Sequence, residues 1–365
     1  MSSSPAPRCL LLLLVMSAGF AACGNDLDVD GGDGPIAAPS TVESELRTNA
    51  DPDRLVVYSN NIENMIFDWK DLVHQMEAAP LRPDLFLVQQ ISSKDELDRL
   101  IAFMNQRLGV TYQGVVAQGV PDDTRFDGQV LPRPLVTTGI IFRAARFELK
   151  NRDSWMPFGR GFKGNRQSCD QRSNNSGYES LRVKLYDRVA REHVVAVSLR
   201  HWTWEPCSMK NLRDIVEGHD GGDNDHRGLG QQAALHIVGG DFNDRLFDAD
   251  GDYKCWYRQA NGALPKGSCG GADLGFTDPL FASCDGDKAC VRRRGGIDSL
   301  LVRRSDGRPA RTDHFDIVSW EDAHRSSVRT TGGDARSNLR SRDGYNDVAG
   351  RYSGHEARTA WVYYR

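Results

Sequence analysis

The segment His236–Asp244, which reads HIVGGDFND, joins an apolar run to two glycines, an acid, an aromatic residue and an amide. One interpretation is a simple turn after a strand, because Gly permits unusual backbone angles while Asp and Asn cap freed backbone groups. A second interpretation is that the strand end carries the side chains of a functional site. On an extended segment Asp241 and Asn243 project to the same side, and the two glycines would let a substrate approach the backbone closely. The other strand ends decide between the two.

From residue 54 onward the chain alternates strand-like and helix-like segments. Residues 67–78 place an apolar stripe on one helical face, and Ser93 with Glu96 forms a capping box that starts a second helix. Strands are predicted over residues 54–60, 83–90, 135–143, 180–186, 193–201, 235–242, 297–303, 314–320 and 358–364. Helices among so many strands predict an α/β fold with more than one sheet layer.

The composition is that of an ordinary globular protein, with 39% hydrophobic and 26% charged residues in a chain of 365. A formal net charge of -4 gives no global basic field that would indicate nucleic acid. Three glycine-rich polar insertions, at residues 151–178, 217–230 and 248–295, are predicted to be surface loops stapled by disulfides. The length accommodates one large α/β domain over residues 54–365.

The N-terminus has the order of an export signal: Arg8, an apolar run too short to span a membrane, and small residues. Residues 20–23, with the sequence FAAC, resemble the bacterial lipoprotein signal, in which the Cys is lipidated. The resemblance implies a signal peptide over residues 1–22 and a lipid on Cys23. An ordinary secretory signal cut nearby is the alternative.

Residues 23–53 are acidic and rich in Gly, Pro and Ala without an apolar period, which predicts a disordered tether. The expected location is therefore outside the cytoplasm, at the outer membrane or cell surface, or else periplasmic or secreted. The membrane is contacted through the lipid anchor only, and no protein partner is inferred.

Six cysteines remain in the exported chain, which suggests three disulfides. Near neighbours such as Cys284 and Cys290 are expected to pair.

Several other predicted strands end or begin with polar residues, as the strand in residues 236–244 does. The stretches are SNNIEN (59–64), LRHW (199–202), GGDFND (239–244), GGIDSLL (295–301) and YSGHEAR (352–358). Their order and character resemble the endonuclease/exonuclease/phosphatase superfamily, the deoxyribonuclease-I-like fold, over residues 54–365. The resemblance implies two β-sheets packed face to face and flanked by helices, a four-layer α/β sandwich. It also implies hydrolysis of phosphate esters with Mg²⁺ (or Mn²⁺).

The resemblance assigns phosphate and metal contacts to five positions. Asn61 and Asn243 are implied to bind the phosphate. Asp241 is implied to orient or activate the attacking water and, with Gln90, to be a metal ligand. Glu63 is a further expected metal ligand. Gln90 stands where the superfamily usually has a metal-binding Glu, so a neutral oxygen replaces a carboxylate there. Mg²⁺ prefers carboxylate oxygens, and this departure weakens the predicted metal site.

The resemblance also assigns two histidines. His201 is implied to contact the scissile phosphate, and Asp298 to orient His355, since a carboxylate fixes the imidazole tautomer. Amide donors, imidazole and a hard cation together offset the charge that grows on phosphate oxygens in the transition state. A second departure precedes His355, where Gly354 replaces the aspartate of the superfamily's terminal motif.

Three functions remain open at this stage. The leading hypothesis is an exported, membrane-anchored metal-dependent phosphodiesterase, most consistent with an endonuclease acting on nucleic acid. Seven arginines between residues 292 and 311 favour nucleic acid, although they also suit a solvated loop and strand edge. The second hypothesis changes the substrate to a phospholipid or sphingomyelin. The third is a non-catalytic binding module with a degenerate metal site, which Gln90 and Gly354 favour.

The export prediction is tested by Cys23→Ser. Because the lipid is the expected membrane contact, the variant should move from the membrane fraction to the soluble fraction, while wild type stays with membranes. Immunoblots of fractionated cells measure the distribution. Unchanged membrane fractionation of the variant would show that Cys23 carries no anchor.

Overall fold

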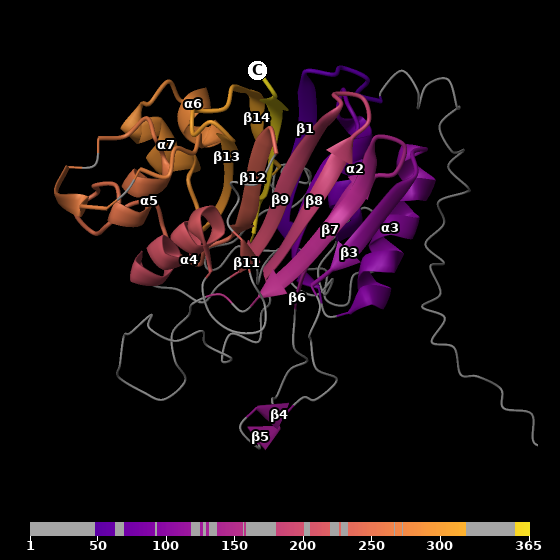
Figure 1. The fold of residues 1–365 in the computed structure, drawn as a ribbon, viewed down its shortest axis with the longest axis horizontal. Helices are drawn as coiled ribbons and strands as arrows, with labels where there is room; N and C mark the ends of the chain where they lie inside the picture. The colour runs from indigo at the N-terminus through magenta and orange to yellow at the C-terminus, as the bar shows by residue number, and fades with distance from the viewer. Residues whose placement is uncertain are drawn as a thin grey trace, which may run out of the picture.

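Two mixed β-sheets lie face to face in the computed structural model, and helices cover both outer faces (Figure 1). The predicted four-layer α/β sandwich is therefore confirmed. The structure describes residues 48–62, 69–91, 93–117, 125–126, 129–130, 137–155, 157, 180–200, 205–219, 226–227, 233–265, 267–271, 273–318 and 355–365.

The first sheet has six strands in the order β14-β15-β1-β2-β6-β3. Its central pair, β1 and β2, is parallel, and the remaining neighbours are antiparallel. The bounds are β1 Arg54–Asn61, β2 Leu85–Ile91, β3 Tyr112–Val116, β6 Thr137–Arg143, β14 Thr312–Val318 and β15 Ala357–Tyr363.

The second sheet has five strands in the order β13-β12-β9-β8-β7, with one parallel pair, β9 and β12. The bounds are β7 Phe147–Trp155, β8 Ser180–Asp187, β9 Glu192–Arg200, β12 Leu235–Asp241 and β13 Asp298–Arg304. Two short pairs of strands are also antiparallel: β4 Arg125–Phe126 with β5 Gln129–Val130, and β10 Gly218–His219 with β11 His226–Arg227.

In the part of the chain that the structure describes, two helices cover the first sheet and four lie beside the second. Ser93 caps α3 by accepting a hydrogen bond from the Glu96 backbone N–H, as the capping box predicts. Within the described residues, no helix is both long enough and apolar enough to cross a membrane. The bounds are α2 Trp69–Ala78, α3 Lys94–Leu108, α4 Glu205–Glu217, α5 Cys255–Ala260, α6 Pro279–Ser283 and α7 Lys288–Arg294, with a 3₁₀ turn at Gly267–Cys269.

The core between the sheets is built by period-two alternation along the strands. In β1, Leu55 and Val57 belong to the inter-sheet core, whereas Val56 and Tyr58 pack with the helices outside. The same alternation places Ile237 of β12 in the inter-sheet core and Val238 in the cluster under α4 and α5. Both β1 and β12 are thus apolar on two faces, and both of those faces are covered.

The inter-sheet face changes from apolar to polar in the last steps of several strands. In β9, Val194 and Ala196 are core residues, and Ser198 and Arg200 follow at the same period. Ser198 accepts a hydrogen bond from Gln89 of the facing sheet at 3.0 Å and donates one to the Val88 carbonyl at 2.8 Å. Both sheets therefore end, on one side, in polar groups that face each other.

Gly239 and Gly240 are required by packing rather than by substrate approach, which corrects the sequence-based interpretation. A Cβ at position 239 would lie 2.5 Å from Oγ of Ser59 and 2.6 Å from Cδ1 of Leu87, both in the facing sheet. A Cβ at position 240 would lie 2.2 Å from the carbonyl oxygen of Leu199 in the neighbouring strand. The glycines let the two sheets meet closely where the polar ends begin.

The opposite end of the sandwich is joined by buried ion pairs. Arg146, which is fully buried, donates to Asp84 beside β2 at 3.2 Å and to Asp187 of β8 at 2.8 Å. Arg143 adds a second contact to Asp84 at 3.3 Å. Because Asp84 and Asp187 belong to different sheets, this network fixes how the sheets are placed at the end away from the polar residues.

The segment 248–295 differs from the predicted surface loop. It forms α5, α6 and α7, and its Trp256, Tyr257 and Phe276 are buried against the outer face of the second sheet. The glycine-rich composition of this segment did not predict these helices, because a few large aromatic residues supply most of their apolar surface. Disulfides Cys255–Cys269 and Cys284–Cys290 close it, the second as expected; Cys207 is also disulfide-bonded.

Close sheet packing at Gly239 predicts the effect of Gly239→Ala. The added methyl should lower the free energy of unfolding by about 1–3 kcal/mol through overpacking. The cost should be smaller in a Ser59→Gly background, because the facing side chain is then gone. Chemical denaturation of the four proteins of this cycle measures both effects. Equal costs in both backgrounds would contradict the contact.

Candidate active site

Three charged residues lie in a row across the second sheet, at the end where Gly239 allows close packing. In the strand register, Asp241 of β12 is opposite Asp298 of β13 on one side and Arg200 of β9 on the other. Residues in register on neighbouring strands point to the same face. The row faces the first sheet, since Asn61 at the end of β1 donates to Asp241.

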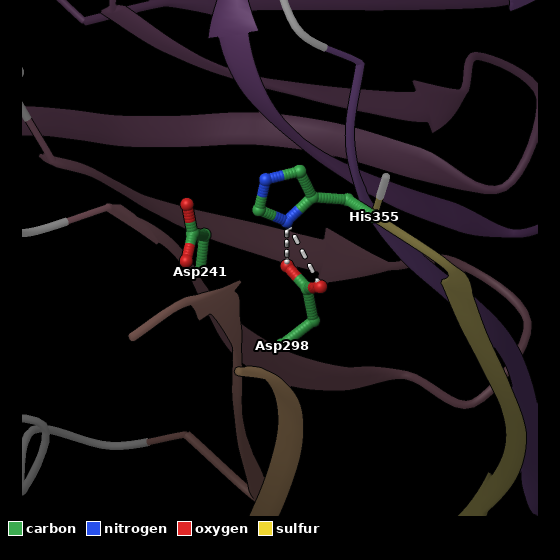
Figure 2. A group of neighbouring side chains, drawn as sticks. All are labelled: Asp241, Asp298 and His355. Carbon is green, nitrogen blue, oxygen red and sulfur yellow. Dashed lines mark hydrogen bonds and ion pairs between the residues drawn. The ribbon is translucent and has the colours of Figure 1, made fainter. Parts of the chain in front are cut away.

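His355 and Asp298 form a buried pair beside Asp241. Nδ1 of His355 lies 3.1 and 3.0 Å from the two carboxylate oxygens of Asp298, and Figure 2 shows the ring above that carboxylate. The carbonyl oxygen of His355 accepts a hydrogen bond from Asn60 at 3.1 Å, which fixes the backbone. The pairing predicted for Asp298 and His355 is present, with the other ring nitrogen, Nε2, on the side toward Asp241.

Asp241 accepts hydrogen bonds on both carboxylate oxygens. Oδ1 accepts from the Asn243 backbone N–H at 2.8 Å, and Oδ2 accepts from the Asn61 and Asn243 amides, each at 2.9 Å. Nε of Arg200 donates to Oδ2 at 3.2 Å. A carboxylate offers about four lone-pair positions, so these donors match its accepting capacity.

Asn243 reaches Asp241 through a turn, not along an extended strand as predicted. β12 ends at Asp241, and Asn243 has φ 46°, in the left-handed region that Asn adopts more readily than most residues. The turn folds the Asn243 amide back onto the Asp241 carboxylate. The two residues therefore lie together, as expected, but Asn243 is hydrogen-bonded to Asp241.

The charges in the row determine the protonation of Asp241. Burial raises the pKa of the Asp241 carboxyl above its usual value, and the adjacent Asp298 carboxylate raises it further. His355 and Arg200 act in the opposite direction and lower that pKa. Two carboxylates directly opposite each other repel, so the row depends on Arg200 at one end and His355 at the other.

Arg200 is the site residue that sequence analysis missed. The Gln90 amide is assigned with its oxygen, rather than its nitrogen, facing the neighbouring donors. In this orientation the oxygen accepts from Nε of Arg200 at 2.8 Å, from a terminal guanidinium nitrogen at 2.5 Å and from the Asn61 amide at 3.2 Å. Gln90 has φ 58° at an irregularity in the β2–β6 pairing. A bulge of this kind redirects a side chain, and here the Gln90 side chain meets Arg200. The signal for Arg200 was its period-two spacing from Ala196 and Ser198.

The described residues do not fit the Mg²⁺ site that the resemblance implies. Two predicted ligands, Gln90 and Asp241, both contact the Arg200 guanidinium. Asp241, Asp298 and His355 do offer three ligand atoms within 4.8 Å of one another. However, Nδ1 of His355 and the Asp298 carboxylate face each other, and Mg²⁺ prefers a set of oxygen ligands.

Three sequence-based assignments lie outside the described residues: Glu63, His201 and Cys23. The predicted arginine run is divided between the two ends of the sandwich. Arg292 and Arg293 are exposed in the last turn of α7, shortly before Asp298. By contrast, Arg303 and Arg304 are in register with the first residues of β12, at the end away from Asp241.

No protein-family model and no curated protein matches the chain. Solved structures similar to it include D. rerio TDP2 complexed with a single-strand DNA product, at 13% identity and a TM-score of 0.45, over 85% of this chain and 98% of that one. The Leptotrichia buccalis endonuclease/exonuclease/phosphatase family protein is similar at 12% identity and a TM-score of 0.47, over 84% and 99%.

The human Nocturnin catalytic domain with bound sulfate is similar at 14% identity and a TM-score of 0.41, over 86% of this chain and 95% of that one. At such identities, function is argued from this chain's own side chains.

The turn at Asn243 predicts different outcomes for two substitutions. Asn243→Gly and Asn243→Ala both remove the side-chain hydrogen bond to Asp241. The backbone of Ala is in addition strained at φ 46°, an angle that Gly adopts readily. Asn243→Ala should therefore be about 1 kcal/mol less stable than Asn243→Gly. Denaturant titration of both variants measures the difference, and equal stabilities would show that the left-handed turn is absent.

Proposed function

We propose that this chain is a phosphodiester hydrolase whose substrate is nucleic acid. The observation that carries the proposal is the buried His355–Asp298 pair, placed within reach of Asn61 and Asp241 at the meeting end of two sheets. An imidazole oriented by a carboxylate is suited to moving a proton. An amide donor beside it is suited to a phosphoryl oxygen.

His355 performs the proton transfer. Asp298 occupies the Nδ1 side of the ring, so Nε2 is the nitrogen that faces Asn61, 3.4 Å from its amide nitrogen. A water oxygen forms a bond to phosphorus while Nε2 accepts the proton of that water. The ester P–O bond breaks, the departing oxygen takes a proton from solvent, and His355 later releases its proton to solvent.

Asp241 acts mainly by positioning. Its carboxylate accepts from the Asn61 amide at 2.9 Å and so holds that amide nitrogen 3.4 Å from Nε2 of His355. Asn243 holds the Asp241 carboxylate through two hydrogen bonds. The donors are thus arranged before substrate arrives, which is what makes electrostatic stabilisation of a transition state effective. The role of Asp241 in orienting the attacking water belongs to the same proposal.

Nucleic acid is favoured as substrate by Arg292 and Arg293, which are exposed at the end of α7 and lead into Asp298. Basic side chains of this kind contact a phosphate backbone without reading sequence. Phospholipid or sphingomyelin is the second substrate class, and it would use the same His355–Asp298 pair. No step described for His355, Asn61 and Asp241 uses Mg²⁺ or Mn²⁺, because Arg200 contacts two of the predicted ligands.

Export is part of the proposal. Residues 1–22 would direct export, and a lipid on Cys23 with the tether to residue 53 would then hold the domain of residues 54–365 at a membrane surface. Nucleic acid outside the cytoplasm would then be the accessible substrate.

The substrate proposal is tested on the mature wild-type domain with plasmid DNA, RNA and sphingomyelin vesicles. Each is incubated with Mg²⁺, Mn²⁺, Ca²⁺ or chelator, and cleavage products are quantified. Cleavage of DNA or RNA is the expected result. Cleavage of sphingomyelin alone would select the second substrate class, and no cleavage of any substrate would favour a binding module.

The residue assignments predict that His355→Ala and Asp241→Ala lower the hydrolysis rate by about 10²–10⁴-fold. His193→Ala and Asp153→Ala, on β9 and β7 away from the site, serve as matched controls and should retain the rate. Circular dichroism checks that each variant is folded. A folded His355→Ala variant with wild-type turnover would refute the proton-transfer role.

A further inference from the structure

The Arg200 guanidinium contacts two of the residues that would hold a divalent cation, Gln90 and Asp241. Its Nε donates to Asp241 at 3.2 Å and to the Gln90 side-chain oxygen at 2.8 Å, and a second nitrogen donates to Gln90 at 2.5 Å. Both partners belong to the ligand set that the sequence predicts for a divalent cation. Arg200, Gln90 and Asp241 come from three different strands, β9, β2 and β12, so the guanidinium joins the two sheets.

The charges of the partners match a guanidinium. Gln90 is neutral and Asp241 carries one negative charge when ionised, so one positive charge balances the pair. A Glu at position 90 would make two carboxylates, which suits a divalent cation instead. All three side chains are at least nine-tenths buried, and a buried charge is stable only when it is paired and hydrogen-bonded.

The backbone at Gln90 supports the same arrangement. Its φ of 58° is uncommon for a residue with a side chain, and strain of this kind persists when surrounding contacts enforce it. The contacts in question are those of the amide oxygen to Arg200 and Asn61. The unusual backbone conformation of Gln90 and the hydrogen bonds of its side chain to Arg200 thus depend on each other.

We propose that Arg200 supplies, opposite the substrate phosphate, the positive charge that a divalent cation would otherwise supply between Gln90 and Asp241. The inference rests on the proposed phosphodiester hydrolysis. A guanidinium is planar, keeps its charge at all physiological pH values and matches two phosphate oxygens with parallel N–H donors. Negative charge that grows on those oxygens is then offset by Arg200 beside Asn61, and the enzyme needs no metal at this position.

The first experiment measures metal binding without reference to activity. Titration calorimetry with Mn²⁺ is carried out on wild type, Gln90→Glu, and the double variant Gln90→Glu with Arg200→Ala. Wild type and Gln90→Glu should bind no Mn²⁺ at the site, because Arg200 stays between the ligands. The double variant, with two carboxylates and no guanidinium, should bind one Mn²⁺. Binding of Mn²⁺ by wild type that is lost in Asp241→Ala would overturn the inference.

The second experiment measures hydrolysis in chelator. Wild type should retain its rate, and Arg200→Lys should lose about 10²-fold, because an ammonium lacks the planar fork that joins Asp241, Gln90 and phosphate. Arg182→Lys, a matched arginine paired with Asp153 at 2.8 Å in the same sheet, should keep the wild-type rate. Arg200→Lys retains the positive charge that pairs with Asp241, so the hydrolysis test does not depend on whether Arg200→Ala folds.

The two experiments separate two failures. Wild type that cleaves no substrate, yet binds no Mn²⁺ until Arg200 is removed, would refute the proposed hydrolysis and leave the charge replacement standing. Wild type that cleaves its substrate only with added metal, at a site lost in Asp241→Ala, would keep the hydrolysis and refute the role of Arg200.

Discussion

The close contact of Gly239 with Ser59 and Leu87 sets the distance between the two sheets at the end that carries the site. Two residues farther along, Asp241 meets the Asn61 amide of the facing sheet at 2.9 Å. A side chain at position 239 would push β12 away from β1 and separate these partners. The opposite end is fixed by Arg146 between two aspartates. The sheets are therefore clamped at both ends, and the polar residues between them have little freedom to move.

Within this frame, charge balance determines what the site can do. Burial raises the pKa of Asp241, and Asp298, in register on the neighbouring strand, raises it further. Arg200 and His355 compensate from the two ends of the row, and Asp298 orients His355. The same interactions that stabilise two buried acids also present an imidazole nitrogen, an amide and a guanidinium to one region. Stability and proposed chemistry depend on the same contacts.

The strand and helix pattern of the sequence predicted the layered fold, because period-two and helical apolar spacing reflect burial directly. Asn61, Asp241, Asn243, Asp298 and His355 do come together, as the motifs predicted. Two details depended on backbone angles that the sequence does not display: the turn at Asn243 and the bulge at Gln90. Arg200 was not predicted because the resemblance assigns a role to His201 next to it, although the spacing of Arg200 from Ser198 places it on the inter-sheet face. Glu63, His201 and Cys23 stay predictions.

The central claim is that a guanidinium takes the place of a metal between Gln90 and Asp241. A crystal structure of the wild-type domain, soaked with Mn²⁺ and a non-hydrolysable phosphodiester and measured at the manganese absorption edge, tests it most directly. The expected result is that no anomalous peak lies between these two residues and that Arg200 lies within hydrogen-bond distance of a phosphate oxygen. An anomalous peak bound to Asp241, with Arg200 turned away from it, would contradict the account.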